Sequence, residues 1–338
     1  MMKSIRTLVR QDREKYVIPR RVQDVIPIQK IWEDGIFLTG GRYAKSFRFT
    51  DINYQVASEP GKEKMFRGYS AIINSLDCRA TTKITIFNHR MSQINFEKSI
   101  LMPMQWDGLD DYREEYNQML LDKATNGNGI VQEKFITISV RRKDVDAARS
   151  FFARVEADLS SHFAALGSTC GPMNAIERLQ ILHRFYRSGE ENEFRFSLRD
   201  SARKGHSFRD YICPDSIERH SDYLQIGDRF ARVLYLKDYA SYIQDDFVSE
   251  LTDLNRDMML SIDMVPIPTD EAVREVENRL LGVETNITNW QRRQNSNNNF
   301  SAVVPYDLEQ QRKETREMLD DLTTRDQRML FAVVTLVH

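Results

Sequence analysis

The sequence has few residues of the types that usually form disulfides or bind metals. Its three cysteines, Cys78, Cys170 and Cys213, are too sparse for a disulfide framework and lack metal-ligand spacing, so they predict free thiols in a reducing compartment. None of the six histidines has a second histidine four residues later. The spacing therefore predicts no metal site.

Long apolar runs and catalytic signatures are also missing. No stretch approaches the roughly 18 apolar residues of a spanning helix, and the first residues lack an apolar signal region. The motifs GxxxxGK[ST], GxGxxG, HExxH, GxSxG and CxxC do not occur. Neighbouring acids such as Asp110 and Asp111 point in different directions on a helix, so they are poor acid–base pairs. The sequence predicts no catalytic, cofactor-binding or metal-binding residue.

Charge is almost balanced, with 48 Lys and Arg residues against 50 Asp and Glu residues. This balance argues against a protein that coats nucleic acid through bulk charge. Residues 1–22 are an exception, because this arm carries an excess of basic residues that includes Lys3, Arg6 and Arg10. The arm is compatible with contact to anionic lipid or nucleic acid, or with a frayed terminus, which is the favoured interpretation.

The remaining composition is that of a folded protein, with 41% hydrophobic and 29% charged residues. Alternating β-branched residues predict strands at 82–87 and 135–140. Apolar residues at intervals of three and four predict helices at 110–125 and 144–166, with Asp144 as the cap of the second.

An internal repeat determines the predicted architecture. Gly40–Asp51 aligns without gaps on Gly227–Asp238, and the order of strands and helices after each segment is the same. We therefore predict an α+β protein with two ferredoxin-like lobes, at 23–175 and 223–338, joined by an irregular, partly helical connector at 176–222. The second lobe stops after its last strand, without a covering helix, which predicts a fragment of a longer protein.

The helix predicted at 269–293 is the most informative single element. Thr269 and Asp270 are suited to cap it, its apolar residues form one stripe, and Trp290, Arg292 and Arg293 lie near its end. One interpretation is a helix that docks a partner subunit through the stripe and this tip. The other, favoured because most amphipathic helices cover a core, is that the stripe packs on its own sheet.

Strand aromatics offer a further alternative. Phe47 and Phe49 have the alternation of base-stacking residues in RNA-recognition domains. The matching residues of the repeat are Leu234 and Leu236, which cannot stack on a base, so a role in the core is favoured.

Seven stretches together resemble one protein family. The sequence is similar to the N-terminal region of VirB-type conjugal-transfer ATPases, which power type IV secretion, from integrative conjugative elements of Gram-positive bacteria. The resemblance covers nearly the whole chain from Val22 onward. The matching stretches are Pro27–Gln29, Asp34–Phe37, Phe47–Tyr54, Ser99–Met104, Tyr211–Asp215, Thr285–Gln294 and Thr323–Arg328.

The resemblance implies that this chain is an assembly region that lacks the ATPase domain of the family. In the family a RecA-like domain, which binds ATP and magnesium, follows the region seen here. This chain lacks that domain, so we expect it to be inactive alone, with no cofactor of its own. The resemblance implies docking to channel subunits, including a small membrane subunit, and a hexamer in the full-length protein. It also implies a cytoplasmic protein at the inner face of the cell membrane.

The expected contact residues are Trp290, Arg292 and Arg293 with the arm residues Lys3, Arg6 and Arg10. An alternative function is a stand-alone nucleic-acid-binding module that uses duplicated ferredoxin-like sheets.

Overall fold

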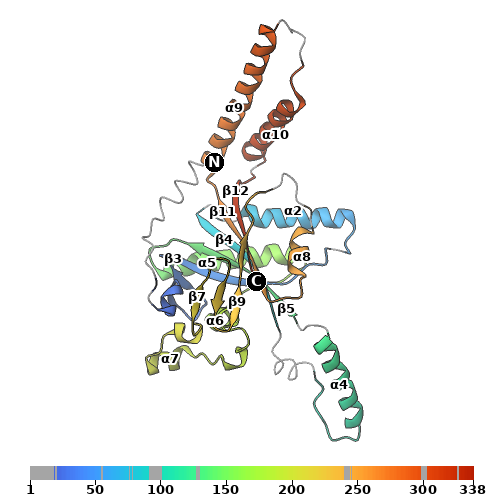
Figure 1. Cartoon of the computed structure of the whole chain (residues 1–338), viewed down its shortest axis with the longest axis vertical. Coiled ribbons are helices and arrows are strands. Elements are labelled where there is room, and N and C mark those ends of the chain that lie inside the picture. Colours follow the sequence, from blue (N-terminus) through green and yellow to red (C-terminus); the bar gives the residue numbers. More distant parts are fainter. Residues whose placement is uncertain are drawn as a thin grey trace. The chain divides into compact units, whose positions relative to one another are not determined.

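A computed structural model describes residues 19, 21–54, 56–75, 77, 79–90, 101–126, 130–239, 244, 246–297, 303–325 and 327–338 (Figure 1). The predicted α+β class is confirmed, because helices alternate with antiparallel strands. The chain forms two compact units. We call Val265–Phe331 with Ile73–Arg79 the hairpin unit, and Pro19–Ile72, Ala80–Met264 and Ala332–His338 the sheet unit.

The main sheet has nine strands within the described residues, in the order β1-β2-β3-β5-β4-β11-β12-β10, with β6 paired to β3. The strands are β1 (Ile28–Ile31), β2 (Phe37–Thr39), β3 (Arg42–Phe49), β4 (Ala80–Arg90), β5 (Ile130–Val140), β6 (Cys170–Pro172), β10 (Val233–Tyr235), β11 (Met258–Pro266) and β12 (Leu330–Val337).

Strands β4 and β5 form the centre of this sheet. Both predicted strands are confirmed and are longer than predicted, at eleven residues each. The register places Ile84 opposite Ile136, and side chains alternate between the two faces from that point. On the other edge of β4, Ile86 lies opposite Leu260 of β11, so the antiparallel ladder continues into the second half of the chain.

The sheet unit also contains six α-helices, three 3-10 helices and a small sheet among its described residues. The helices are α2 (Glu59–Ser75), α4 (Asp110–Asn126), α5 (Val145–Ala165), α6 (Ala175–Tyr186), α7 (Leu198–Lys204) and α8 (Phe247–Thr252), with η1 (Val22–Val25), η2 (Glu191–Glu193) and η3 (Phe208–Tyr211). The small antiparallel sheet consists of β7 (Ile217–Arg219), β8 (Leu224–Ile226) and β9 (Arg229–Ala231).

Helices α5 and α6 pack on opposite faces of the main sheet. The predicted cap of α5 is confirmed, since the Asp144 carboxylate accepts a hydrogen bond from the Ala147 N–H. Phe163 of α5 lies against Phe49, with 5.3 Å between ring centroids. On the other face, Ile181 of α6 packs in a cluster that contains Phe87.

The segment predicted as a connector contributes to a core. Phe196, Ile212 and Cys213 are buried together with Phe37 of β2 and Leu179 of α6. These apolar residues do not recur at a helical or strand period, so periodicity alone did not assign them to a core.

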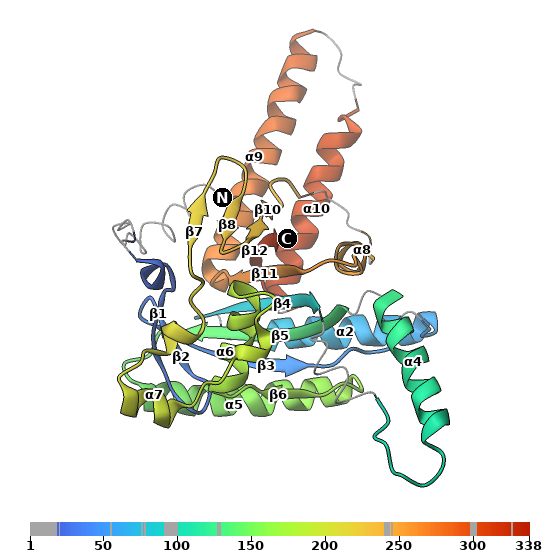
Figure 2. The same ribbon diagram turned by 60° about the horizontal axis from the view of Figure 1, so that its bottom comes forward.

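The hairpin unit is built on two helices, α9 (Thr269–Ser296) and α10 (Tyr306–Thr323), which lie side by side (Figure 2). Ala272 and Val276 of α9 are buried against Leu322 of α10. The expected cap of α9 is wrong, because the N-cap residue is Pro268 and no side chain caps the helix. Pro268 instead presets the backbone for the first turn.

The two segments of the internal repeat share a turn but differ in burial. Gly40 and Gly227 both adopt positive φ, +54° and +56°, in the β2–β3 and β8–β9 hairpins. Phe47 is 1% exposed, as the core interpretation predicts, whereas the matching Leu234 is 47% exposed. The ferredoxin-like character of the two lobes stays a prediction.

Candidate interaction surface

The predicted contact residues of α9 differ in their exposure. Arg292 and Arg293 are exposed, and within the described parts of the chain neither guanidinium group has a carboxylate within 4.0 Å. Trp290 is half-buried. It continues the stripe that contains the buried residues Val283 and Ile287, so its ring belongs partly to the packed side of the helix.

At its N-terminal end the stripe of α9 packs within the chain, against Leu322 of α10. The favoured interpretation also expected packing within the chain, but on a sheet. Arg316 of α10 also pairs with Glu284 at 2.8 Å. The arm residues Lys3, Arg6 and Arg10 lie outside the described residues, so their expected contact role stays a prediction.

Sequence reasoning missed an apolar surface on residues 101–126. Trp106 is 89% exposed, and Tyr112 of α4 is 70% exposed. The periodic apolar residues of this helix predicted the helix itself correctly, but a buried stripe and an exposed one have the same periodicity. We call this segment the α4 surface. Its exposed large apolar residues are Met102, Met104, Trp106, Leu109, Tyr112, Tyr116 and Met119.

Hydrogen bonds give the α4 surface a defined shape. Asn117 accepts a hydrogen bond from the Met102 N–H and donates one to the Met102 carbonyl, at 2.8 and 2.9 Å. The backbone N–H of Trp106 donates a hydrogen bond to the Asp110 carboxylate. Trp106 itself adopts a positive φ of +58°. Left-handed backbone is uncommon for a large side chain, so local contacts hold Trp106 in its exposed position.

The α4 surface is also acidic. Asp107 and Asp110 accept hydrogen bonds from Arg113, and the Arg113 bond lowers the pKa of Asp107 to about 2. Residues 101–126 carry six carboxylates against Arg113 and Lys123. Exposed aromatic rings beside uncompensated acids suit a partner that is apolar and basic.

The most strongly coupled titratable cluster surrounds Glu133 on β5. His89 Nε2 lies 3.0 Å from Glu133 Oε1, Arg184 donates to the same oxygen, and Arg48 lies 2.8 Å from Oε2. Burial acts to raise the pKa of Glu133, but the His89 hydrogen bond and the charges of Arg184 and Arg48 outweigh it and hold the pKa at about 2. A carboxyl group with this pKa is ionised near neutrality, so it ties β3, β4, β5 and α6 together rather than serving as a general acid.

The two described cysteines are not activated. Burial, with a smaller effect from Glu156, raises the pKa of Cys170 to about 11. Burial also raises the pKa of Cys213, and both thiols are free. A protonated thiol is a poor nucleophile, so neither residue has the environment of a catalytic cysteine.

The described residues hold neither a candidate metal site nor a candidate membrane span. No group of three or more His, Cys, Asp or Glu side chains in these residues is arranged to hold a metal ion. None of the described helices combines the length and the apolar character needed to cross a membrane.

Comparison with models of protein families and with curated proteins gives no match. The sequence fits no model of a protein family, and no curated protein shows significant similarity to it. The resemblance to conjugal-transfer ATPases therefore stays a prediction from the quoted stretches.

Proposed function

We propose that this chain is the N-terminal assembly region of a conjugative type IV secretion ATPase, and that it docks the motor to channel subunits. One observation carries the proposal. Long insertions with exposed apolar or basic residues connect neighbouring strands in both halves of the chain. Residues 91–129, which include the α4 surface, connect β4 to β5, and the α9–α10 hairpin connects β11 to β12.

The strand order supports two related halves. The order β6-β3-β5-β4 is antiparallel throughout, with α2 between β3 and β4 and α5 between β5 and β6. We propose that this half is a ferredoxin-like unit with an extended connection between its second and third strands. The second half has the strand order β10-β12-β11, which corresponds to β3-β5-β4 of the first half. In this correspondence the α9–α10 hairpin is the equivalent of residues 91–129, because each connects the second of the three strands along the chain to the third.

The two insertions differ in charge, which favours different contacts for each. The α4 surface is acidic and aromatic and suits a basic, apolar segment of a channel component, such as the small membrane subunit. The end of α9 exposes Arg292 and Arg293 and therefore suits an acidic partner surface. We propose that a neighbouring copy of the chain in a hexamer supplies this surface. ATP and magnesium binding belong to the domain that follows in the family.

The test is co-purification of this chain with channel subunits of a type IV secretion system. We expect the double substitution Trp106→Ser with Tyr112→Ser to reduce recovery of the small membrane subunit while the melting temperature stays unchanged. The double substitution Arg292→Ala with Arg293→Ala is expected to reduce self-association of the full-length protein instead.

A matched control exists on the same helix. Arg274 and Arg279 are exposed on α9 as well, so their replacement by Ala removes the same charge away from the tip. Undiminished recovery of every partner with the α4-surface and tip variants would contradict the proposal. Salt-dependent DNA binding by the chain alone would favour the nucleic-acid-binding alternative.

A further inference from the structure

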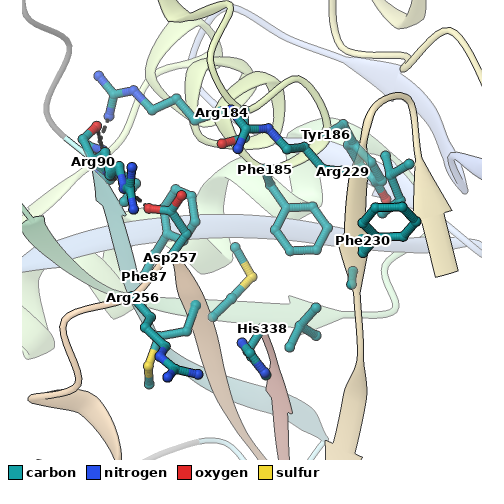
Figure 3. A pocket seen from close by; sticks show the side chains of 17 residues that line it. Phe87, Arg90, Arg184, Phe185, Tyr186, Arg229, Phe230, Arg256, Asp257 and His338 are labelled. Carbon is teal, nitrogen blue, oxygen red and sulfur yellow. Dashed lines mark hydrogen bonds between the residues drawn. The ribbon is translucent and has the colours of Figure 1, made fainter. Parts of the chain in front are cut away.

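A cavity of about 270 Å³ lies in the sheet unit, on the face of the main sheet that α6 covers (Figure 3). Its walls come from β4, α6, β9, β11 and β12 and from the residues that precede β11. Segments far apart in the sequence therefore build it, and none of its lining residues belongs to either proposed docking surface.

The interior of the cavity is apolar and aromatic. Phe87 and Met259 belong to neighbouring strands and lie directly opposite each other in the β4–β11 register. Phe185 of α6 packs on the same cluster. Phe230 of β9 lines the cavity as well and is 67% exposed, so its ring is accessible from solvent. An accessible phenylalanine ring offers a planar ligand a surface on which to stack.

Arginines surround this apolar interior. Arg90, Arg184, Arg229 and Arg256 all line the cavity, and Figure 3 shows them around the rings of Phe185 and Phe87. Asp257 is the one acidic residue among the described lining residues, and its Oδ1 accepts a hydrogen bond from the backbone N–H of Arg90 at 2.9 Å. The lining thus has a clear excess of positive charge.

Three of these arginines have no acidic partner among the described residues. Arg184 pairs with Glu133. Within the part of the chain that the structure describes, the guanidinium groups of Arg90, Arg229 and Arg256 have no carboxylate within 4.0 Å, and all three residues are exposed. Arg229 also lies close to the backbone of Gly189, where an added Cβ would come within 3.3 Å of its Nη2 atom. Unpaired guanidinium groups beside an apolar cavity are suited to bind an anion, because the planar fork matches phosphate and carboxylate oxygens.

These features limit the class of ligand. The ligand needs a flat apolar part for the phenylalanine rings and an anionic part for the arginines. The volume lies just below the usual range for small-molecule sites, so the ligand is compact. A nucleoside monophosphate combines a stacking base with a phosphate in one compact molecule.

We propose that this cavity binds a nucleoside monophosphate or an equally compact aromatic phosphate, with Phe185 and Phe230 beside the base and the unpaired arginines of the lining available to the phosphate. This site is independent of the proposed docking function. The proposal concerns ligand binding alone, and no bond is made or broken in it.

Isothermal titration calorimetry of the whole chain with AMP, adenosine and inorganic phosphate tests the proposal. We expect saturable binding of AMP that is at least about tenfold tighter than binding of adenosine or phosphate alone, since each lacks one set of contacts. Replacing both Arg229 and Arg256 by Ala should weaken AMP binding at least about tenfold, because charge-assisted hydrogen bonds are lost. The control Arg203→Ala removes an exposed arginine of α7 outside the cavity and should leave AMP binding unchanged.

Several results would overturn the proposal. One is the absence of AMP, GMP and UMP binding at millimolar concentration. Another is equal AMP affinity in the double variant and in Arg203→Ala. Tighter binding of the tripeptide Glu-Phe-Glu than of AMP would assign the cavity to an acidic peptide instead. If the double variant does not fold, the variant Phe230→Ala is measured in its place. Loss of this exposed ring should weaken the binding of AMP measurably and leave the binding of phosphate unchanged.

Discussion

The guanidinium carbon of Arg178 lies 3.9 Å from the centroid of the Phe37 ring, which places a buried cation on an aromatic face. Its Nη1 atom donates hydrogen bonds to the carbonyls of Gly35 and Ala44, each at 2.7 Å. Burial lowers the pKa of Arg178 to about 9. The Arg178 side chain thereby fixes helix α6 to the β2–β3 hairpin. Two backbone carbonyls and an aromatic ring stabilise its charge, where an ion pair would use a carboxylate.

The substitution Arg178→Lys should therefore destabilise the sheet unit, although the charge is conserved. A compact ammonium cannot stack on Phe37 and reach both carbonyls, so we expect a loss of about 2 kcal/mol in the free energy of unfolding. Urea denaturation measures it. The exposed Arg199 of α7 provides the control, and an equal loss with Arg199→Lys would show that the buried contacts of Arg178 have no special value.

Two glycines in the same region should respond differently to alanine. Gly35 has φ of +79°, and a Cβ there would lie 1.9 Å from the Met173 carbonyl oxygen, which is backbone and cannot move aside. We expect Gly35→Ala to cost at least about 3 kcal/mol or to prevent folding. Gly40 also has positive φ but no atom near its Cβ position, so Gly40→Ala should cost only about 1 kcal/mol. Thermal unfolding of both variants checks the difference, which similar melting temperatures would contradict.

The Glu133 cluster predicts a loss of stability in acid. The folded-state pKa of about 2 is below the ordinary value of 4.5, so the stabilisation is complete above pH 4.5 and is lost as the pH falls toward 2. The contribution is on the order of 3 kcal/mol. Urea denaturation at a series of pH values should show this decline, and Glu133→Gln should make it shallower. Glu63→Gln, which alters an exposed ion pair, should leave the decline as it is.

Helix α9 of the hairpin unit has one buried and one exposed aliphatic side chain whose truncation can be compared. Val276 of α9 is 1% exposed in the cluster with Leu322, whereas Leu281 is 67% exposed. We expect Val276→Ala to cost about 1–2 kcal/mol through lost burial and a small cavity, and Leu281→Ala to cost well under 1 kcal/mol. Hydrogen exchange of α9 and α10 amides reports the effect locally. Equal protection in the two variants would mean that the stripe does not hold the hairpin together.

The sequence predicted most of the regular elements, because their signals are local. The cap at Asp144 and the alternation around Ile84 identify α5 and β4 directly. The exposure of Trp106 and Tyr112 could not be predicted, because a helical stripe does not show whether another element covers it. The cavity was missed for a related reason. Arg90, Arg229 and Arg256 are far apart in the sequence, and only the strand order brings them together.

The pairing of β4 with β11 has a consequence for synthesis of the chain. Strand β4 is synthesised early. The residues that pair with one of its edges, Met258–Met264 of β11, leave the ribosome only after the small sheet and α8. Until then, an apolar strand in the middle of the future sheet has unpaired backbone groups that can join another nascent chain. Synthesis is therefore a stage at which misassembly can occur. Slowing translation before Met258 should increase the yield of aggregates, even though the finished protein would be unchanged.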